Sequence, residues 1–367
     1  MLGMKSQTFH IEICVKLCYN NVMRKTFKYR IYPTAKQKNL MNKMLEECRW
    51  VFNQTLALRK NAWENEQKSI SLYQSNSFLQ KWKNERPTLN VVYSQVLQDV
   101  QERVDLAFQA FFRRVKTGEK PGYPRFRGKG RYDSFTYPQF GFALQDRQIK
   151  VGKIGLIKAI IHRPLEGKPK TLTIRRHSAG KWYACFSCEV QPEPFPPSEK
   201  AVGVDVGLES FATLSTGEKI PNPRFFKRYE KVLAKAQRRL SSEEKGTPER
   251  AKRRRVVANI YERIANKRRD FAHKLSRRLV NEFSIIAFEK LNSKGMLKNH
   301  FLAKSIADAA WQQLVQFTAC KAEWAGRRFV LVESKNTSKR CSRCGTIVDK
   351  DLSTRIHSCP VCSLSLD

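Results

Sequence analysis

The amino-acid sequence predicts an α+β multidomain protein, and three observations lead to that class. The chain has 367 residues, of which 41% are hydrophobic, so it can bury a sizeable core and divide into two or three domains. Segments with helical periodicity alternate with segments of strand-like alternation. Two Cys-x-x-Cys pairs lie close to the last residue, at the spacing of a small metal-binding module.

The N-terminal third combines one strand with two long helices. The run TFKYRIYP alternates basic and apolar residues, which predicts a strand that Pro33 closes. Thr34 and Gln37 have the spacing of a capping box and predict the start of a helix. A second helix is predicted from about Ser94 to Lys116. We expect the apolar and aromatic stripes of both helices to be core: Leu40, Met44, Leu45, Cys48, Val51, Phe52 and Leu56 on the first, and Leu97, Val100, Val104, Phe108, Phe111 and Val115 on the second.

The segment KPGYPRFRGKGRYDSFTYP, which follows the second helix, cannot form a helix interior, because it is rich in Gly and Pro. Its aromatic residues lie beside Arg125 and Arg127, and this mixture is typical of a nucleic-acid surface. From Phe140 to Val190 the pattern is strand-like. The Pro-rich run QPEPFPPSEK then predicts a linker and a domain boundary.

The C-terminal half alternates apolar strands with basic helices. AVGVDVGL predicts a buried strand, and ESFATLSTGEKI its hairpin partner. A basic helical zone follows from Phe226 to Phe283, and Gly246 and Pro248 predict a break in it. SIIAFEKL and RRFVLVE predict two further strands, with one helix from Ile306 to Trp324 between them.

The formal charge of +37, from 70 Lys and Arg against 33 Asp and Glu, indicates a polyanionic partner, and nucleic acid is the expected one. Arg254 and Arg268, in the basic helical zone, are candidate phosphate contacts, although a solvated charged face is the common alternative. No run of eighteen apolar residues occurs, so we expect no membrane span. Residues 1–22 lack a signal-peptide pattern, and we expect them to be an extension upstream of a second start at Met23.

Two acidic residues interrupt the apolar strands. Asp205 stands at the end of AVGVD between two glycines, and Glu289 follows IIAF. A carboxylate in a buried strand is costly unless it is paired or binds a cation. If the two strands are neighbours, the pair predicts a divalent metal site, with Mg²⁺ as the expected ion. A purely structural pair remains the alternative.

The cysteines give the stronger signal. Cys341 and Cys344 precede Cys359 and Cys362 at the spacing of a four-thiolate zinc ribbon, so we expect a structural Zn²⁺. His357 is a competing ligand, but four thiolates already fill a tetrahedron. Cys185 and Cys188 also form a Cys-x-x-Cys pair, which we interpret as ordinary strand residues. Nothing indicates a disulfide framework, and a reducing cytoplasm fits.

From Met23 to the last residue the chain resembles TnpB, the transposon-encoded RNA-guided DNA nucleases. The resemblance rests on FKYRIYPT, FFRRVKTGEKPGYPRFRG, GVDVGL, NKRRDFAHKLS, FEKLN and the CSRC…CPVC pair. It implies a wedge-like β-barrel (23–34 and 119–192) with an inserted helical recognition domain (35–118). After a linker (193–200), an RNase H-like RuvC nuclease domain (201–334) and a zinc ribbon (335–367) are expected.

The resemblance also implies roles for individual residues. Asp205 and Glu289 match the first and second catalytic carboxylates, which bind Mg²⁺ or Mn²⁺, and the four ribbon cysteines match the zinc ligands. Tyr73, Gln98 and Thr136 fall where the family contacts the duplex beside its target. The implied partners are a guide RNA from the element's end and double-stranded target DNA, in a prokaryotic cytoplasm at the nucleoid. Base pairing would then read the target, while the protein reads a short adjacent motif.

The resemblance also implies a DRDxNAA-type segment after the last cysteine. Asp367 matches the first acidic residue of that segment, and the family's third catalytic aspartate is the second. We therefore expect this 367-residue chain to bind RNA and DNA but to cut slowly or not at all. Three functions follow: an RNA-guided, metal-dependent DNA endonuclease; an inactive relative that binds guide RNA and DNA as a regulator; and, less favoured, a transposase that joins strands itself.

Overall fold

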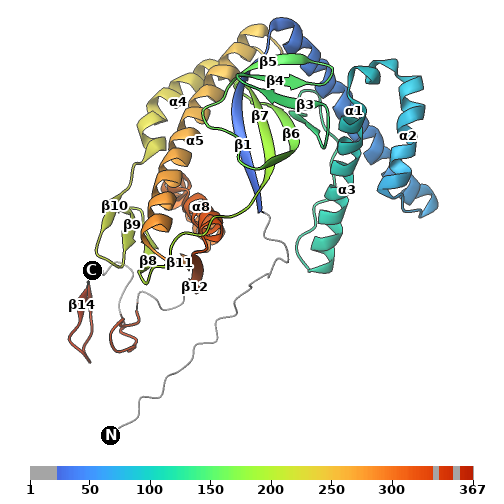
Figure 1. Ribbon diagram of the computed structural model, residues 1–367. Coiled ribbons are helices and arrows are strands. Elements are labelled where there is room, and N and C mark those ends of the chain that lie inside the picture. Colours follow the sequence, from blue (N-terminus) through green and yellow to red (C-terminus); the bar gives the residue numbers. More distant parts are fainter. Residues whose placement is uncertain (1–22, 334–338, 350–355, 367) are drawn as a thin grey trace. The chain divides into compact units, whose positions relative to one another are not determined.

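The computed structural model describes residues 23–333, 339–349 and 356–366, so the expected N-terminal extension and Asp367 lie outside the described residues. The chain divides into two compact units (Figure 1). Unit 1 comprises the residues up to Arg175 and Trp182–Pro192, and unit 2 comprises Arg176–Lys181 and the residues from Glu193 onward. Each unit has its own sheet and its own hydrophobic core.

Unit 1 is built on a curved, barrel-like sheet of seven strands in the order β2-β6-β7-β1-β5-β4-β3 (Figure 1). β1 is the predicted first strand, and it lies between β7 and β5, antiparallel to both. The strands are β1 (Met23–Tyr32), β2 (Ser134–Tyr137), β3 (Phe142–Gln145), β4 (Gln148–Val151), β5 (Gly155–Ile160), β6 (Lys168–Arg176) and β7 (Trp182–Val190).

Alternate residues of these strands fill the inside of the curve. Phe27, Tyr29 and Ile31 of β1 are buried, as is Phe186 of β7, whereas the intervening basic residues of β1 point outward. β2 and β3 are the two edge strands of this sheet, and a short connection joins them in the sequence. There Gly141 has a φ of +85°, and a Cβ on it would meet Tyr137 at 3.1 Å, so only glycine fits without a shift.

Three helices of unit 1 lie between β1 and β2 in the sequence: α1 (Ala35–Glu66), α2 (Leu72–Glu85) and α3 (Ser94–Lys116), with the 3₁₀ turn η1 (Pro87–Val91) before α3. The capping box of Thr34 and Gln37 is confirmed, and α2 has a second one. α3 has the predicted bounds, but its stripe is core only as far as Phe108. Phe111 is half-buried and Val115 is 52% exposed, which corrects the expectation for these two residues. Among the described residues, no helix or strand covers the last turn of α3.

Unit 2 contains a five-stranded sheet in the order β10-β9-β8-β11-β12. The strands are β8 (Ala201–Val206), β9 (Ser210–Leu214), β10 (Lys219–Pro221), β11 (Ile285–Lys290) and β12 (Arg328–Glu333). β9 is the predicted antiparallel hairpin partner of β8, but the run expected to be one strand also contains β10, which pairs antiparallel with β9. β11 runs parallel to both β8 and β12. One face of the sheet is buried in a core with residues of α5, α7 and α8.

The helices of unit 2 are α4 (Phe225–Ser241), α5 (Pro248–Glu282), the short α6 (Ser293–Met296), α7 (His300–Ala309) and α8 (Trp311–Trp324). The predicted break before Pro248 is confirmed, with Thr247 capping α5. The single helix expected from Ile306 to Trp324 is wrong. Ala310 adopts a left-handed φ of 54° and separates α7 from α8.

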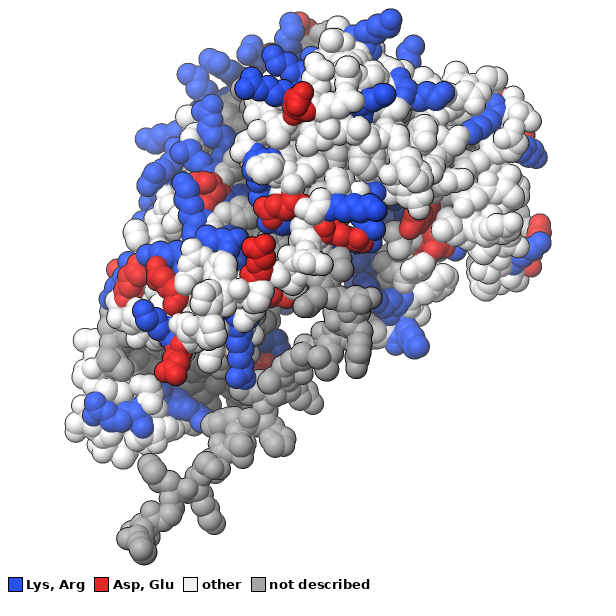
Figure 2. Space-filling view, viewed as in Figure 1, with Lys and Arg blue, Asp and Glu red and all other residues white. Residues whose placement is uncertain are grey.

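Residues near the end of the chain form small antiparallel pairs instead of a larger sheet: β13 (His357–Ser358) with β14 (Ser365–Leu366), and a bridge from Arg340 to Ile347. Over the described ranges, no helix combines the length and the apolarity that crossing a bilayer requires. Lys and Arg side chains gather over α4 and α5 (Figure 2), as the charge of the sequence predicts.

Candidate functional site

Asp205 and Glu289 lie at the same edge of the unit 2 sheet. β8 and β11 are parallel neighbours whose register pairs Gly203 with Ala287 and Val204 with Phe288. Asp205 and Glu289 are the next residues along each strand, so their backbones are separated by about one strand spacing of 4.8 Å. The sequence could only state that these strands might be neighbours. The register brings the two carboxylates together.

The two carboxylates occupy the open face of the sheet. Val202, Val204, Ile286 and Phe288 alternate with them and are buried on the other face. Asp205 is exposed and Glu289 is half-buried, so the expectation of strands buried on both faces is corrected. A ligand can therefore approach both carboxylates from solvent.

The surroundings of Asp205 disfavour its ionised form. Desolvation by neighbouring protein raises the pKa of Asp205, the charge of Glu289 raises it further, and the backbone N–H of Val206 opposes both by donating to the carboxylate. A bound cation would relieve the repulsion that Glu289 exerts on the ionised carboxylate of Asp205. Within the described ranges, no third His, Cys, Asp or Glu joins the pair to make a cluster of three ligands.

A thermal melt of the Asp205→Asn variant tests this electrostatic conflict. A raised folded-state pKa means that ionisation of Asp205 costs stability above the pKa of the unfolded chain, about 3.9. Asp205→Asn should therefore raise Tm near pH 7.5 in chelator, and the gain should disappear as the pH falls below about 4. Asp270→Asn, on the exposed face of α5, is the control and should show no such gain. A lower Tm for Asp205→Asn at pH 7.5 would contradict the conflict.

A tight connection after β8 helps to place Asp205. Gly207 follows Val206, and its N–H donates to the carbonyl of Phe211 at 3.3 Å. A Cβ on Gly207 would approach the Ser210 carbonyl oxygen to 3.0 Å, so a side chain at this position would force the backbone to shift. The second glycine of GVDVGL thus permits the chain to turn directly into β9 after the carboxylate.

The four predicted cysteines form one cluster. The sulfur atoms of Cys341, Cys344, Cys359 and Cys362 all lie within 4.8 Å of one another. The Cys341–Cys362 and Cys344–Cys359 sulfur pairs are 3.4 and 3.5 Å apart. Zn–S bonds of about 2.3 Å in a tetrahedron place the sulfurs about 3.8 Å apart, so the donor set fits a zinc ion.

The two halves of the cluster have the same backbone geometry. Gly345 N–H donates to the Cys341 carbonyl, and Ser363 N–H donates to the Cys359 carbonyl. Both donors adopt a left-handed φ, of 76° and 57°. The Thr346 hydroxyl, which makes a 3.3 Å hydrogen bond with the Cys344 sulfur, and the Thr346 backbone lower the pKa of Cys344 to about 6. The thiolate that a metal requires is therefore already favoured at Cys344.

The remaining metal-ligand candidates do not join this cluster. Cys185 and Cys188 are residues of β7, three positions apart on opposite faces, which confirms their interpretation as strand residues. His357 precedes Cys359 but is not one of the four grouped ligands, so it does not compete for the position.

Three residues were expected to contact the duplex beside the target. Tyr73 lies in the first turn of α2 with 86% of its side chain exposed, and Gln98 is exposed on α3. Thr136 on β2 is buried, and its hydroxyl contacts Arg103 at 2.6 Å and Thr173 at 2.8 Å. Tyr73 and Gln98 are thus accessible, whereas Thr136 orients Arg103.

The four candidate arginines lie in different environments. Arg125 and Arg127 are exposed on the extended segment after α3, and Arg254 is exposed on α5. Arg268 on α5 instead binds Asp308 of α7 at 2.7 Å. The same carboxylate accepts a hydrogen bond from Phe226 N–H at 2.8 Å, at the start of α4. Sequence reasoning missed Asp308 because its partners lie 40 and 82 positions away.

Substitution of Arg268 and Arg254 separates a structural arginine from a surface one. Arg268→Ala leaves the buried Asp308 carboxylate without its cation, and we expect a loss of about 3–5 kcal/mol of unfolding free energy. Arg254→Ala should change stability by less than about 0.5 kcal/mol but reduce the salt dependence of nucleic-acid binding by about one counterion. Urea unfolding and salt-dependent binding measure the two effects, and equal stability of both variants would contradict this assignment.

Three family profiles match separate stretches of the chain. A family profile described as a probable transposase, IS605 OrfB, matches residues 185–300. A helix-turn-helix profile of the same family matches residues 23–68, where the structure has β1 and the single long helix α1. A Cas12f1-like TNB domain profile matches residues 311–367, which include the cysteine cluster.

Relatives extend over nearly the whole chain. The "Putative RNA-guided DNA endonuclease" of Streptomyces pristinaespiralis is 38% identical over 345 residues, covering 92% of this chain and 85% of the relative. The "Putative RNA-guided DNA endonuclease InsQ" of Escherichia coli is 31% identical, covering 91% and 87%. In a cryo-EM structure of a Cas12f1-sgRNA-target DNA complex, a chain only 12% identical aligns with a TM-score of 0.56, covering 89% of this chain and 92% of that one.

The two sheets and the order of their helices are therefore those of an α+β protein that shares the fold of the Cas12f1 chain. The protein belongs to the TnpB family, the OrfB proteins of IS605-type elements.

Proposed function

We propose that the protein is an RNA-guided, metal-dependent DNA endonuclease of a transposable element, which cuts DNA beside a short motif. The observation that carries the proposal is the placement of Asp205 and Glu289 at adjacent ends of two parallel strands, on the accessible face of the sheet. Two relatives that match over most of their length are named as RNA-guided DNA endonucleases, which supports the guided cutting of DNA in this proposal. Hydrolysis of a phosphodiester needs such a carboxylate-rich, open position.

The nuclease domain in this proposal is RuvC-like with an RNase H-like fold, over about 201–334. A meander of three antiparallel strands followed by two parallel strands, with helices in the connections, supports that assignment. Asp205 and Glu289 would hold Mg²⁺ or Mn²⁺, which supplies positive charge to the reacting phosphate when it is bound. The open sheet face admits the DNA strand, and the basic surface of α4 and α5 offers further contacts to nucleic-acid backbone.

The other parts of the chain would bind and position the nucleic acids. We assign the barrel-like sheet (23–34 and 119–192) and the inserted helices (35–118) to the guide RNA and to the duplex beside the target, with Tyr73, Gln98, Arg125 and Arg127 as contacts. Residues 335–367 would be a zinc ribbon whose Zn²⁺ is structural, because four thiolates leave no open coordination position.

The experiment that tests the proposal begins with the protein purified together with the RNA expressed from its own element. Sequencing of the retained RNA should show one discrete species that ends in a guide. The complex should then cleave a plasmid that carries the matching target in Mg²⁺, but not in chelator or with a mismatched target. Retained RNA and guided DNA binding without any cleavage would favour the inactive regulator instead. Absence of a discrete RNA would overturn both.

A further inference from the structure

An aromatic cluster is exposed where α3 ends. Phe112 is 58% exposed and stacks on Phe108, with ring centroids 6.3 Å apart and an interplanar angle of 25°. Tyr123, from the segment that follows, meets Phe108 and Phe111 edge-on at 5.6 and 5.4 Å, and 45% of it is exposed. Phe126 is 53% exposed. Large apolar groups on a surface indicate a partner when they are grouped in this way.

The segment between α3 and β2 begins at a well-defined helix end. Gly118, with a φ of 67°, donates to the Val115 carbonyl, and Glu119 N–H donates to the Arg114 carbonyl at 2.9 Å. These two bonds form a Schellman motif, which stops α3 and sets the direction of the chain. The chain then folds back so that the ring of Tyr123 packs against the aromatic residues of α3.

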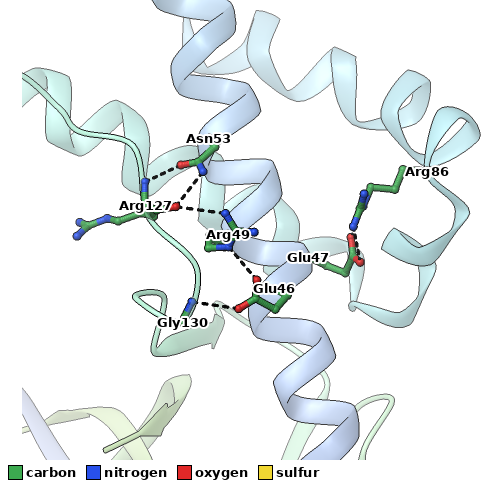
Figure 3. A network of polar contacts seen from close by, with 7 residues as sticks. All are labelled: Glu46, Glu47, Arg49, Asn53, Arg86, Arg127 and Gly130. Carbon is green, nitrogen blue, oxygen red and sulfur yellow. Dashed lines mark hydrogen bonds and ion pairs between the residues drawn. The ribbon is translucent and has the colours of Figure 1, made fainter. Parts of the chain in front are cut away.

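A polar latch on α1 holds the same segment further along (Figure 3). The Asn53 side chain accepts from Arg127 N–H at 2.8 Å and donates to the Arg127 carbonyl at 3.0 Å. Arg49 also donates to this carbonyl and is paired with Glu46, which accepts from Gly130 N–H at 3.4 Å. These hydrogen bonds hold the main chain of the segment, so the exposed side chains of Arg125, Phe126 and Lys129 remain available to a ligand.

The latched segment is strongly basic. Between Arg113 and Arg131 the sequence contains eight Lys and Arg against one Glu. Arg125, Lys129 and Arg131 are exposed, and no ion pair among the described residues involves them. Exposed apolar rings with cations close by in the sequence suit a ligand that has both flat faces and negative charges. An apolar peptide or a second protein helix would leave these cations unmatched.

We propose that residues 112–131 form a preorganised binding strip for unpaired nucleotides of RNA. Phe112 and Phe126 provide faces on which bases stack, and Arg125 and Lys129 contact the phosphates between them. Asn53 is a positioning residue that keeps the strip extended, so less conformational entropy is lost on binding. Unpaired nucleotides fit because a duplex hides its base faces. The choice of RNA over single-stranded DNA rests on the proposed function, in which a guide RNA stays bound to the protein before and during DNA recognition.

Fluorescence anisotropy of a labelled 12-nucleotide polyuridine RNA, with the full-length protein freed of its own RNA, tests the strip. Stacking of one base is worth a factor of about 5–150 in affinity, so Phe112→Ala with Phe126→Ala should weaken binding at least about 20-fold. Phe112→Trp should retain affinity. Phe140→Ala, which removes a 66% exposed phenylalanine from the β2–β3 connection, is the matched control and should leave it unchanged.

Salt dependence separates the roles within the strip. Arg125→Gln with Lys129→Gln should reduce the slope of log affinity against log salt by about 1.4, since each phosphate contact on a single strand contributes about 0.7. The aromatic variant should leave the slope unchanged. Asn53→Ala should lower RNA affinity several-fold and lower Tm by no more than about 2 °C. A residue with a purely structural role would instead lower Tm when it is replaced and leave the RNA affinity of the folded protein unchanged.

Two results would overturn the proposal: unchanged RNA affinity in the aromatic double variant, or a larger loss for single-stranded DNA than for RNA in the same variant. The oligonucleotide assay needs neither a guide nor cleavage. A failure of guided cutting would therefore leave its result standing, and a failure of the strip would leave the carboxylate site untouched.

Discussion

Asp205→Ala should reduce guided DNA cleavage at least about 1,000-fold, while the affinity for guide RNA and target DNA stays within about twofold. Asp205 and Glu289 are the adjacent carboxylates at the open edge of the sheet. The variant would leave a divalent cation at this place with one anionic ligand instead of two. A loss of about 4 kcal/mol of transition-state stabilisation corresponds to that factor. Initial cleavage rates and electrophoretic binding assays on the same RNA-loaded preparation measure the two quantities.

Two further variants define the cause of the loss. Asp205→Asn keeps the size of the side chain and removes its charge, so it should be as inactive as Asp205→Ala. Glu218→Ala removes an exposed carboxylate of the same unit that pairs with Arg278, away from the site, and should cut normally. If Asp205→Ala cuts at the rate of the unmodified protein, the carboxylate pair is not the catalytic centre.

Cys359→Ser should weaken zinc binding by more than about 100-fold and destabilise the ribbon. Cys359 is 3% exposed, and its sulfur lies 3.5 Å from that of Cys344. Loss of a direct ligand should exceed the 10–100-fold cost of changes in the outer shell of metal sites. Residues 339–349 and 356–366 contain only short pairs of strands, so most of their stability must come from the metal.

Zinc content by mass spectrometry, together with limited proteolysis of the ribbon, measures this effect without any assay of activity. Cys320→Ser is the matched control, because Cys320 is an exposed cysteine outside the cluster and should keep one zinc per chain. A strong chelator should reproduce the protease sensitivity of Cys359→Ser in the unmodified protein. Full zinc content in Cys359→Ser would exclude the four-thiolate site.

Strong local signals explain why much of the fold could be predicted from the sequence. The capping box of Thr34 and Gln37 starts α1 at the expected residue, and α3 has the expected bounds. The cysteine spacing correctly anticipated a four-sulfur cluster. In each case the signal comes from residues close together in the sequence, and the backbone hydrogen bonds at these helix ends and turns are local as well.

Long-range contacts explain what could not be predicted. No residue next to Ala310 in the sequence signals the end of a helix, yet α7 ends there. Two residues earlier, Asp308 binds Arg268 and the first turn of α4. The stripe of α3 continues in the sequence through Phe111 and Val115, but no described helix or strand covers them, and Phe111 packs only partly, against Tyr123. Burial depends on which surfaces meet, and helical periodicity does not contain that information.

The sequence by itself determined the α+β class, the basic character, the cysteine cluster and the two carboxylates at strand ends, because composition and short-range spacing carry these features. Only the tertiary structure decided that β8 and β11 are parallel neighbours in a register that aligns Asp205 with Glu289. It also decided that Arg268 pairs with Asp308 and that the Asn53 side chain hydrogen-bonds to the main chain of the basic segment at Arg127. Each of these contacts joins residues at least 40 positions apart, and such pairings follow from packing and strand register.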